Sequence, residues 1–341
     1  MTLETDTDDF PGGAAAAAGV PGLRFRRLRR PDDYPAMNAI ANDIRRGIGD
    51  PFTTSDESFA AFYDMAGGGR FDLDHDVAII ELDGGMVGYG RTGSRQELDG
   101  PRIVEIVPFL PGSQALADVF SATLSLLETH GRALPAVASG APAMFETFGG
   151  DAAPEREALI LAAGYAPVRH GYTMVRPTLD DLPDSPLPEG LEIREVQPEH
   201  LRAIWDASTE AFRDAWGSTE PTEADYERFL AEETGDTALW RVAWDGEVVA
   251  GQVRSFINAD FNRLTGKLRG YTEAISVRRP YRKRGLARAL IAASFPLLRE
   301  RGMTEAALGV DTENVSGALR LYERCGYRPI SRTTTYRKPV A

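Results

Sequence analysis

The sequence predicts a mixed α/β fold made of two similar halves. Three short segments occur twice, in the same order and at nearly the same spacing, which indicates an internal duplication. In the second half, strand-like and helix-like segments alternate, which is typical of a mixed sheet with helices packed against it. A chain of 341 residues is also long enough for two domains of about 150 residues, each burying its own core.

The internal duplication rests on three pairs of matching segments. Each half opens with a strand-like run that leads into a helix start containing proline. Each half then has an Asp-Gly turn between two apolar runs, typical of a hairpin, and later a Gly-Tyr pair. Chance is the alternative, because Asp-Gly turns are common. The matching positions, which lie 162 to 168 residues apart, are Leu23 and Leu191, Asp83 and Asp245, and Gly164 and Gly326.

Composition divides the chain into four segments. Residues 1–22 have an acidic start and are then rich in Ala, Gly and Pro, so we expect a disordered tail rather than a secretory signal. Residues 23–176 and 191–341 carry the two copies of the repeat and are predicted to be the two domains. Residues 177–190, PTLDDLPDSPLPEG, are rich in Pro and Asp and lack periodicity, which is typical of an extended linker.

Charge, cysteine and histidine content narrow the classes of function. A formal net charge of −13 argues against nucleic acid as the main partner and is compatible with a cationic small substrate. The single cysteine, Cys325, rules out an internal disulfide and favours a reducing, cytoplasmic location. No apolar run approaches the ~20 residues that span a bilayer, so we expect no membrane association. The four histidines are scattered without the spacing of metal ligands, so no metal is expected.

Periodicity and turn residues predict the elements of the second half. Helices are expected where apolar residues recur on one face, and the Asp-Gly turn predicts a hairpin. Pro296 should kink its helix or shift the end, and Gly326 should end the last helix at the C′ position. The predicted elements are helices at 204–212 and 222–232, a hairpin at 239–256, a helix at 286–301, a strand at 306–310 and a helix at 317–324.

The segment from Tyr271 to Leu290 combines a strand, a basic loop and a helix start. Pro280 ends the strand because it cannot donate a hydrogen bond to a sheet. Three basic residues follow, then Gly285 and good helix formers from Leu286 onward. Free amides in a first helical turn and the helix dipole favour anions, so the loop is predicted to bind a pyrophosphate. The alternative is a solvated basic turn, and neither the Walker pattern nor G-x-G-x-x-G is present.

Two motifs in this half resemble the acetyl-CoA core of the GNAT superfamily of N-acetyltransferases. The family pattern [QR]-x-x-G-x-[GA] after a strand is matched by Arg282, Gly285 and Ala287. Two motifs at the right separation are more specific than either alone, and the detailed match covers about Glu273 to Tyr327. The second motif has an Asn, then Leu-Tyr, then Gly-Phe or Gly-Tyr, and its matching positions are Asn314, Leu321-Tyr322 and Gly326-Tyr327.

The resemblance implies two tandem GNAT-like domains, each a mixed, mostly antiparallel sheet flanked by helices, as in mycothiol synthase-like proteins. It implies an N-acetyltransferase that moves the acetyl group of acetyl-CoA to a primary amine by direct attack, with general base and acid assistance. The expected acceptor is a small molecule, and the expected assembly is a monomer or a homodimer. The alternative is a non-catalytic acetyl-CoA sensor or a partner-binding module that kept the loop and lost turnover.

In this resemblance the strand and the loop hold acetyl-CoA. The strand backbone should line the acetyl-pantetheine arm, and a bulge should free an amide near Val277 to bind the thioester oxygen. The loop amides should bind the pyrophosphate, with Arg282 and Arg284 adding positive charge. Asn314 should bind the polar arm of the cofactor or, alternatively, serve as a turn residue at a helix start. The expected acetyl-CoA-binding positions are Ile275, Ser276, Val277, Arg282, Lys283, Arg284, Gly285, Leu286, Ala287, Arg288 and Asn314.

The strand and the last helix also supply two candidate catalytic residues. A primary amine is protonated at neutral pH, so a base must remove its proton, and Glu273 is the candidate, acting through water. Alternatively, Glu273 binds the ammonium group of the substrate or pairs with Arg269. Tyr322 is the candidate acid for the departing thiolate. An acyl-cysteine at Cys325 is a further alternative, against which stands the inertness of most buried helix cysteines.

The first half lacks both features at the matching positions. Its strand is followed by PFLPG, from Pro108 to Gly112, with no arginine in the loop. The position of Tyr322 is taken by Ile160, 162 residues earlier. We therefore expect the first domain to be a degenerate copy that supports the fold and has no second active site.

Overall fold

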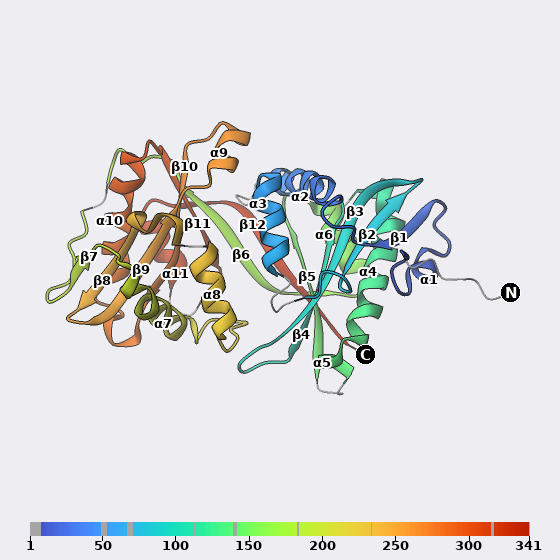
Figure 1. Ribbon diagram of the computed structural model, residues 1–341. Coiled ribbons are helices and arrows are strands. Elements are labelled where there is room, and N and C mark those ends of the chain that lie inside the picture. Colours follow the sequence, from blue (N-terminus) through green and yellow to red (C-terminus); the bar gives the residue numbers. More distant parts are fainter. Residues whose placement is uncertain are drawn as a thin grey trace. The chain divides into compact units, whose positions relative to one another are not determined.

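The computed structural model consists of two compact units (Figure 1). Unit 1 comprises Met1–His170 and Thr333–Ala341, and unit 2 comprises Gly171–Arg332. The residues that the structure describes are 8–48, 53–66, 71–111, 113–138, 142–182, 184–232, 234–314 and 317–340.

Unit 1 is a mixed sheet with helices packed against it. Its strands have the spatial order β1-β2-β3-β4-β5-β12, and neighbours are antiparallel except β4 and β5. Helix α4 packs against β3 and β4, and α6 packs against β5. The elements of the first half are α1 Gly13–Ala17, β1 Leu23–Arg27, α2 Tyr34–Ile48, α3 Asp56–Ala66, β2 Val77–Leu82, β3 Gly85–Gln96, β4 Arg102–Phe109, η1 Gln114–Leu116, α4 Ala117–Ala133, α5 Pro135–Ala138, β5 Ala143–Gly150, α6 Pro154–Ala162 and β6 Ala166–Arg176.

Unit 2 repeats this arrangement. Its strands have the order β6-β11-β10-β9-β8-β7, and neighbours are antiparallel except β10 and β11. Helix α10 packs against β8, β9 and β10, and α7 packs against β9 and β10. The elements of the second half are β7 Glu192–Arg194, η2 Pro198–His200, α7 Leu201–Phe212, α8 Glu223–Glu232, η3 Thr234–Leu239, β8 Trp240–Asp245, β9 Val248–Phe256, α9 Ala259–Thr265, β10 Arg269–Val277, η4 Arg279–Tyr281, α10 Leu286–Glu300, β11 Glu305–Asp311, α11 Ala318–Arg324 and β12 Arg328–Pro339.

The two halves of the sequence match in the order of their strands and main helices, apart from α1, α5 and α9, which have no counterparts. The succession β1-α2-α3-β2-β3-β4-α4-β5-α6-β6 of the first half corresponds to β7-α7-α8-β8-β9-β10-α10-β11-α11-β12 of the second. In each half the fourth strand runs parallel to the fifth. The predicted α/β class, with two tandem, mostly antiparallel sheets flanked by helices, is confirmed.

The last strand of each half contributes to both units. In β6, residues Gly171–Arg176 pair with β11 in unit 2. In β12, residues Thr333–Pro339 pair with β5 in unit 1. Each sheet is therefore completed by a strand from the other half of the sequence. The predicted boundaries at 176/177 and 190/191 do not mark this division, because local composition does not encode which sheet a strand will join.

Two segments predicted to lie outside the domains are packed into them. Phe10 is 2% exposed in the core of unit 1, and Leu179 is 1% exposed in the core of unit 2. The disordered tail predicted for residues 1–22 is therefore wrong for residues 8–22, and residues 1–7 lie outside the described part of the chain. The predicted linker, 177–190, belongs to unit 2.

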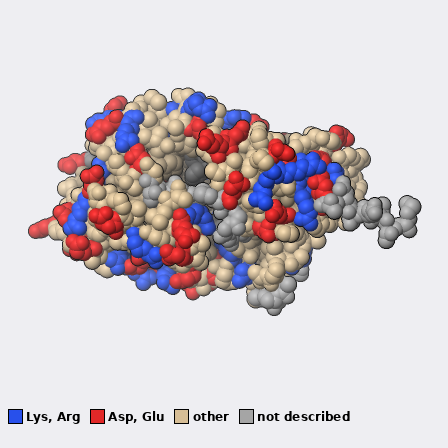
Figure 2. Space-filling model, in the orientation of Figure 1, with Lys and Arg blue, Asp and Glu red and all other residues tan. Residues whose placement is uncertain are grey.

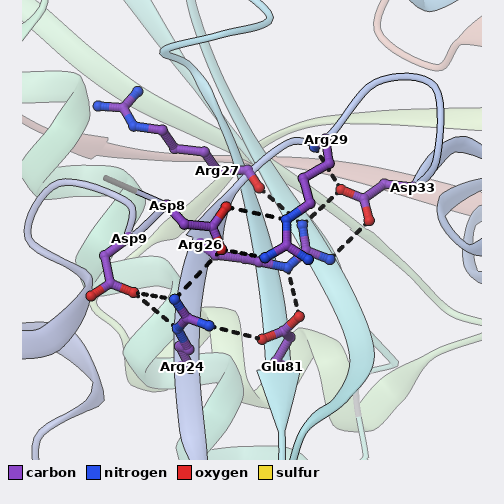
Figure 3. A network of polar contacts seen from close by, with 8 residues as sticks. All are labelled: Asp8, Asp9, Arg24, Arg26, Arg27, Arg29, Asp33 and Glu81. Atoms are coloured by element: carbon purple, nitrogen blue, oxygen red, sulfur yellow. Dashed lines mark hydrogen bonds and ion pairs between the residues drawn. The ribbon is translucent and has the colours of Figure 1, made fainter. Parts of the chain in front are cut away.

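Two arginines of β1 form ion pairs with residues before and after that strand and on β2 (Figure 3). Arg26 on β1 donates to both carboxylate oxygens of Asp33, at 2.7 and 2.8 Å, and to Glu81 at 2.6 Å. Arg24 donates to Asp9 at 2.9 Å. Burial alone would raise the pKa of Asp33, but hydrogen bonds, chiefly from Arg26, lower it on balance. Charged residues that composition assigns to a tail are thus part of the fold.

Helix α9, Ala259–Thr265, was not among the predicted elements, and Pro296 was predicted to kink its helix or shift the end. Pro296 lies inside α10, which continues to Glu300, so the proline does not end the helix. Among the described residues, no helix is both long and apolar enough to cross a membrane.

Candidate active site

Strand β10 carries a bulge where the sequence resemblance predicts one. Glu273 lies opposite Arg254 of β9, whereas Ser276 lies opposite Gln252, so β10 has one extra residue between these pairs. Ala274, inside the bulge, has a φ of 47°, a left-handed conformation that residues with a Cβ rarely adopt. A bulge leaves strand backbone groups without a ladder partner, which makes them available to a ligand.

Beside the bulge, β10 and β11 form a fork. The parallel ladder joins Arg269–Tyr271 to Glu305–Ala307 and ends there. Beyond it, the Glu273 side chain reaches across to β11, where Oε1 accepts a hydrogen bond of 2.8 Å from the Gly309 amide. Because β10 ends at Val277, the open end of this fork continues directly into the basic loop.

The carboxyl group of Glu273 has a pKa near neutral pH. Burial raises the pKa of Glu273 to about 7, although the hydrogen bond from Gly309 opposes the shift. A carboxyl group that is half ionised near neutral pH can accept a proton and return it. Arg269, the alternative partner of Glu273, donates instead to Glu305 at 2.7 Å and lies over the Phe261 ring.

Tyr322 lies on α11 with 7% of its surface exposed. Burial raises the pKa of the Tyr322 phenol, and the charges of Glu273 and Cys325 raise it further. The phenol is therefore protonated at neutral pH, as an acid must be. Cys325 is fully buried, and burial raises the pKa of its thiol, which fits inert packing rather than acyl transfer.

The basic loop enters α10 through two left-handed residues. Lys283 has a φ of 62° and Gly285 a φ of 87°, and Gly285 directly precedes the first helical residue. A Cβ built on Gly285 would meet nothing within 4 Å, so the space beside it is open. The amides of the first turn, Leu286 to Arg288, have no acceptor within the helix, which makes this helix start suited to an anion.

The Arg282 guanidinium is occupied by contacts within the protein. It donates to the Val277 carbonyl at 3.0 Å and to the Ala211 carbonyl at 3.1 Å, and it lies 3.4 Å from the Asp214 carboxylate. Arg282 thereby ties the end of β10 and the loop to the end of α7. These contacts use three of its five N–H donors, and its role toward a pyrophosphate stays a prediction. From Lys283 to the first turn of α10, the exposed cationic side chains are Lys283, Arg284 and Arg288.

Asn314 lies in the turn between β11 and α11. Its backbone N–H donates to the Asp311 backbone carbonyl at 3.3 Å, and its backbone carbonyl accepts from the Gly317 N–H at 3.2 Å. The turn role is thus observed, and the role toward a cofactor stays a prediction. The other predicted binding positions lie along one stretch, with Ile275, Ser276 and Val277 on β10 after the bulge and Lys283 to Arg288 in the loop and first turn of α10.

Sequence reasoning missed three residues that position the site. Gly309 donates to Glu273, and Ala211 and Asp214 hold Arg282. Each is far along the chain from its partner, so no local pattern links them. The one available signal is a glycine inside a strand, which often marks a close approach to the backbone.

Charges of both signs are interspersed on the molecular face in Figure 2. The loop follows this pattern, because Arg278 donates to Glu210 at 2.8 Å and Arg279 to Asp214 at 3.0 Å. Carboxylates at the end of α7 thus balance the first arginines of the loop, and the uncompensated positive charge lies toward the start of α10. Within the described ranges, no group of three or more His, Cys, Asp or Glu side chains is placed to hold a metal ion.

Residues 201–327 match the model of the Acetyltransferase (GNAT) family. A mycothiol acetyltransferase of Salinispora arenicola is 31% identical over 188 residues, which are 54% of this chain and 60% of that protein. The mycothiol acetyltransferase of Streptomyces coelicolor is 29% identical over 258 residues, 73% of this chain and 75% of that protein. The matches to the first three such relatives span 59% to 61% of their length.

Solved structures share the fold over nearly the whole chain. A GCN5-related N-acetyltransferase from Sphaerobacter thermophilus superimposes with a TM-score of 0.70 and 25% identity, covering 94% of this chain and 96% of that one. A tandem GNAT protein from the clavulanic acid biosynthesis pathway has a TM-score of 0.62 at 15% identity, covering 94% and 99%, and shows the fold alone. The family match falls on unit 2, which holds the bulge, the fork and the loop. Unit 2 therefore carries the segment that matches the Acetyltransferase (GNAT) family model, and the chain shares the fold of tandem GNAT proteins.

Proposed function

We propose that this protein is an acetyl-CoA-dependent N-acetyltransferase, with its active site in unit 2 and a small primary amine as acceptor. The observation that carries the proposal is the direct succession of the β10 bulge, the glycine loop and the start of α10. Glu273, in the same strand, adds a proton acceptor with a pKa near neutrality. The match of residues 201–327 to the Acetyltransferase (GNAT) family model supports the same reaction class.

The residues around the loop fit a cosubstrate that carries phosphate groups. The first-turn amides and the helix dipole favour a pyrophosphate, and the open space beside Gly285 lets it approach the backbone. The exposed Lys283, Arg284 and Arg288 add positive charge around this point. Acetyl-CoA supplies an activated thioester when bound, and the protein supplies binding, orientation and proton transfer.

Glu273 is proposed to take the proton of the attacking amine, directly or through water. A base is most effective when its pKa lies near the working pH, and Glu273 meets this condition better than an ordinary glutamate with a pKa of about 4.3. A backbone amide near Val277, freed by the bulge, is proposed to stabilise the negative oxygen of the tetrahedral intermediate.

Tyr322 is proposed to protonate the departing thiolate. Its phenol keeps its proton at neutral pH, and the charge of Glu273 acts on it directly. A thiol with a pKa of about 8.5 is already a fair leaving group, so the assistance needed from Tyr322 is moderate.

Calorimetric titration of the full-length protein with acetyl-CoA tests the proposal. One site per chain is expected, and Gly285→Glu should abolish binding by filling the open space with an anionic side chain. Gly266→Glu is the matched control, because Gly266 also has a positive φ, 69°, and open space beside it, but ends α9. Absence of binding in the wild type, or an equal loss in both variants, would contradict the proposed site.

An acceptor screen follows once binding is established. Several relatives carry the name mycothiol acetyltransferase, so a small primary amine related to mycothiol is assayed first, beside a panel of other small primary amines. Acetyl-CoA binding without transfer to any acceptor and without slow hydrolysis would support the alternative of a non-catalytic sensor or partner-binding module.

A further inference from the structure

Unit 1 keeps the fork of parallel strands but not the features that surround the fork in unit 2. The parallel ladder of β4 and β5 runs from Arg102 and Ala143 to Glu105 and Glu146 and ends there. The register of β4 with β3 runs without a shift from Gln96–Arg102 to Tyr89–Phe109, so β4 is continuous where β10 is bulged. We call the region between β4 beyond Glu105 and β5 beyond Glu146 the fork of unit 1.

The Arg156 side chain, on α6, bridges the two prongs of this fork. Its guanidinium donates to the Pro108 and Leu110 carbonyls at 3.0 and 3.2 Å, and to the Phe148 carbonyl of β5 at 3.1 Å. It also lies over the Phe120 ring of α4, 5.2 Å from the ring centroid. One side chain thus satisfies carbonyls on both strands and closes the space between them with a flat cation.

This arrangement suits a guanidinium better than any other side chain. Strand carbonyls that have lost their ladder partner need a donor if they are to stay away from water. Arginine offers five N–H donors in a rigid plane, whereas a lysine ammonium is a compact group that cannot span such a fork in the same way. Burial lowers the pKa of Arg156 to about 10, so the group remains charged at neutral pH.

The repeat identifies the residue of unit 2 that corresponds to Arg156. The spacing of 162 residues that relates Gly164 to Gly326 places Ala318 at this position. Ala318 is the first residue of α11, as Arg156 lies in the first turn of α6. A methyl group cannot reach between two strands and has no donor, so the fork of unit 2 is crossed by Glu273 and not by a cation from α11.

We propose that Arg156 is a built-in plug, whose guanidinium closes the fork of unit 1, whereas Ala318 at the matching position brings no such group to the fork of unit 2. Unit 1 is then more than an empty copy that lost its loop. Its fork is an internal guanidinium-binding site, filled by the chain itself and closed to a cosubstrate.

Chemical rescue of the full-length Arg156→Ala variant tests the plug. Two strand carbonyls and that of Leu110, just after β4, lose their donor, so the melting temperature should fall by at least about 4 °C. Millimolar methylguanidinium should restore part of this loss, and methylammonium at the same concentration should not. Arg46→Ala, which removes an exposed arginine of unit 1, should show neither effect. If the alanine variant does not fold alone, refolding with methylguanidinium should recover it. The proposal would be overturned if Arg156→Ala were as stable as the wild type. It would also be overturned if methylguanidinium neither raised the melting temperature of the variant nor helped it to refold.

The reciprocal variant, Ala318→Arg, introduces the plug into unit 2. The folded variant should bind acetyl-CoA at least about 100-fold more weakly than the wild type. Unchanged acetyl-CoA binding in a folded Ala318→Arg protein would also overturn the proposal. This arm rests on the proposed function. If the wild type binds no acetyl-CoA, the proposed function fails and the methylguanidinium experiment still decides on Arg156.

Discussion

Two opposing influences set the properties of Glu273. Burial favours the neutral acid, and the Gly309 amide favours the carboxylate, with burial the larger. The outcome is a pKa of about 7, where a small change in pH produces a large change in the ionised fraction. Because a base must be ionised to work, activity should increase as the pH rises through this value.

Glu273→Gln should lower kcat/KM by about 100- to 10,000-fold, the usual contribution of a general base. The ascending limb of the pH profile near pH 7 should disappear with it, because glutamine does not titrate. The measurement is a pH–rate profile with saturating acetyl-CoA. Glu323→Gln, an exposed change of equal charge on α11, should keep both the rate and the limb. An ascending limb that persists in Glu273→Gln would exclude Glu273 as the base.

Tyr322→Phe should slow acetyl transfer by roughly 10- to 1000-fold, toward the lower part of the range for general acids. The removed hydroxyl belongs to a neutral phenol whose pKa is raised by burial and by Glu273, so the loss is of a proton donor rather than of a charge. Single-turnover assays at saturating substrate isolate this step. A loss below about threefold would assign Tyr322 to packing alone.

At the scale of elements, the basic loop depends on α7, a helix that is remote from it in sequence. Arg282 joins the end of β10, the loop and the end of α7 through contacts with Val277, Ala211 and Asp214. Its position in the motif predicts contact with a phosphate, and three of its five N–H donors bind groups of the protein. We therefore expect Arg282 to act by positioning the loop amides.

Arg282→Ala should weaken acetyl-CoA binding by about tenfold, since hydrogen bonds of roughly 1 kcal/mol each are lost. Arg282→Lys should not restore binding, because an ammonium cannot reproduce the planar set of donors. The effect should persist at high salt, where the loss caused by Arg288→Ala, an exposed cation, should shrink. Titrations at low and high ionic strength provide the measurement. Equal salt dependence in both variants would show that Arg282 acts through charge.

The sequence predicts the elements of the site well and the directions of its side chains poorly. Pro280 and Gly285 predict the loop from local rules, because proline ends a strand and glycine permits a positive φ. The orientation of Arg282 is set by α7, and that of Arg156 by two strands that separate, so neither follows from neighbouring residues. The position of Phe10 in a core was missed for a similar reason, because an Ala- and Gly-rich segment suggests a tail until its one aromatic residue is packed.

At the scale of the whole molecule, the internal duplication could be predicted. That the last strand of each half pairs with a strand of the other half could not. Repeated turns at fixed spacing reveal two copies, but β6 and β12 have equivalent places in the two halves. Nothing in their local patterns states that Gly171–Arg176 joins unit 2 and Thr333–Pro339 joins unit 1. Long-range pairing decides this, together with contacts such as those of Arg337 with Glu97 and Glu146 in unit 1.

Removal of residues 333–341 should therefore destabilise unit 1 although most of the second half remains. Strand β5 would lose its partner across Met144–Gly150, and Glu146 would lose Arg337 from a buried position. Hydrogen exchange followed by mass spectrometry should show faster exchange in β5, with β11 protected nearly as before. If exchange became faster to a similar degree in β5 and β11, residues 333–339 of β12 would support both sheets equally.

The exchanged strands also bear on how the protein is made. A ribosome releases the chain from the amino end, so residues 8–170 emerge long before Thr333–Pro339, which pair with β5. Until then β5 presents an open edge, and such edges invite association with other chains. Unit 2 has its borrowed segment, Gly171–Arg176, available from the start. The unit synthesised first is thus the one that must wait longest to complete its sheet, and a nascent chain that stalls before residue 333 would leave that edge exposed.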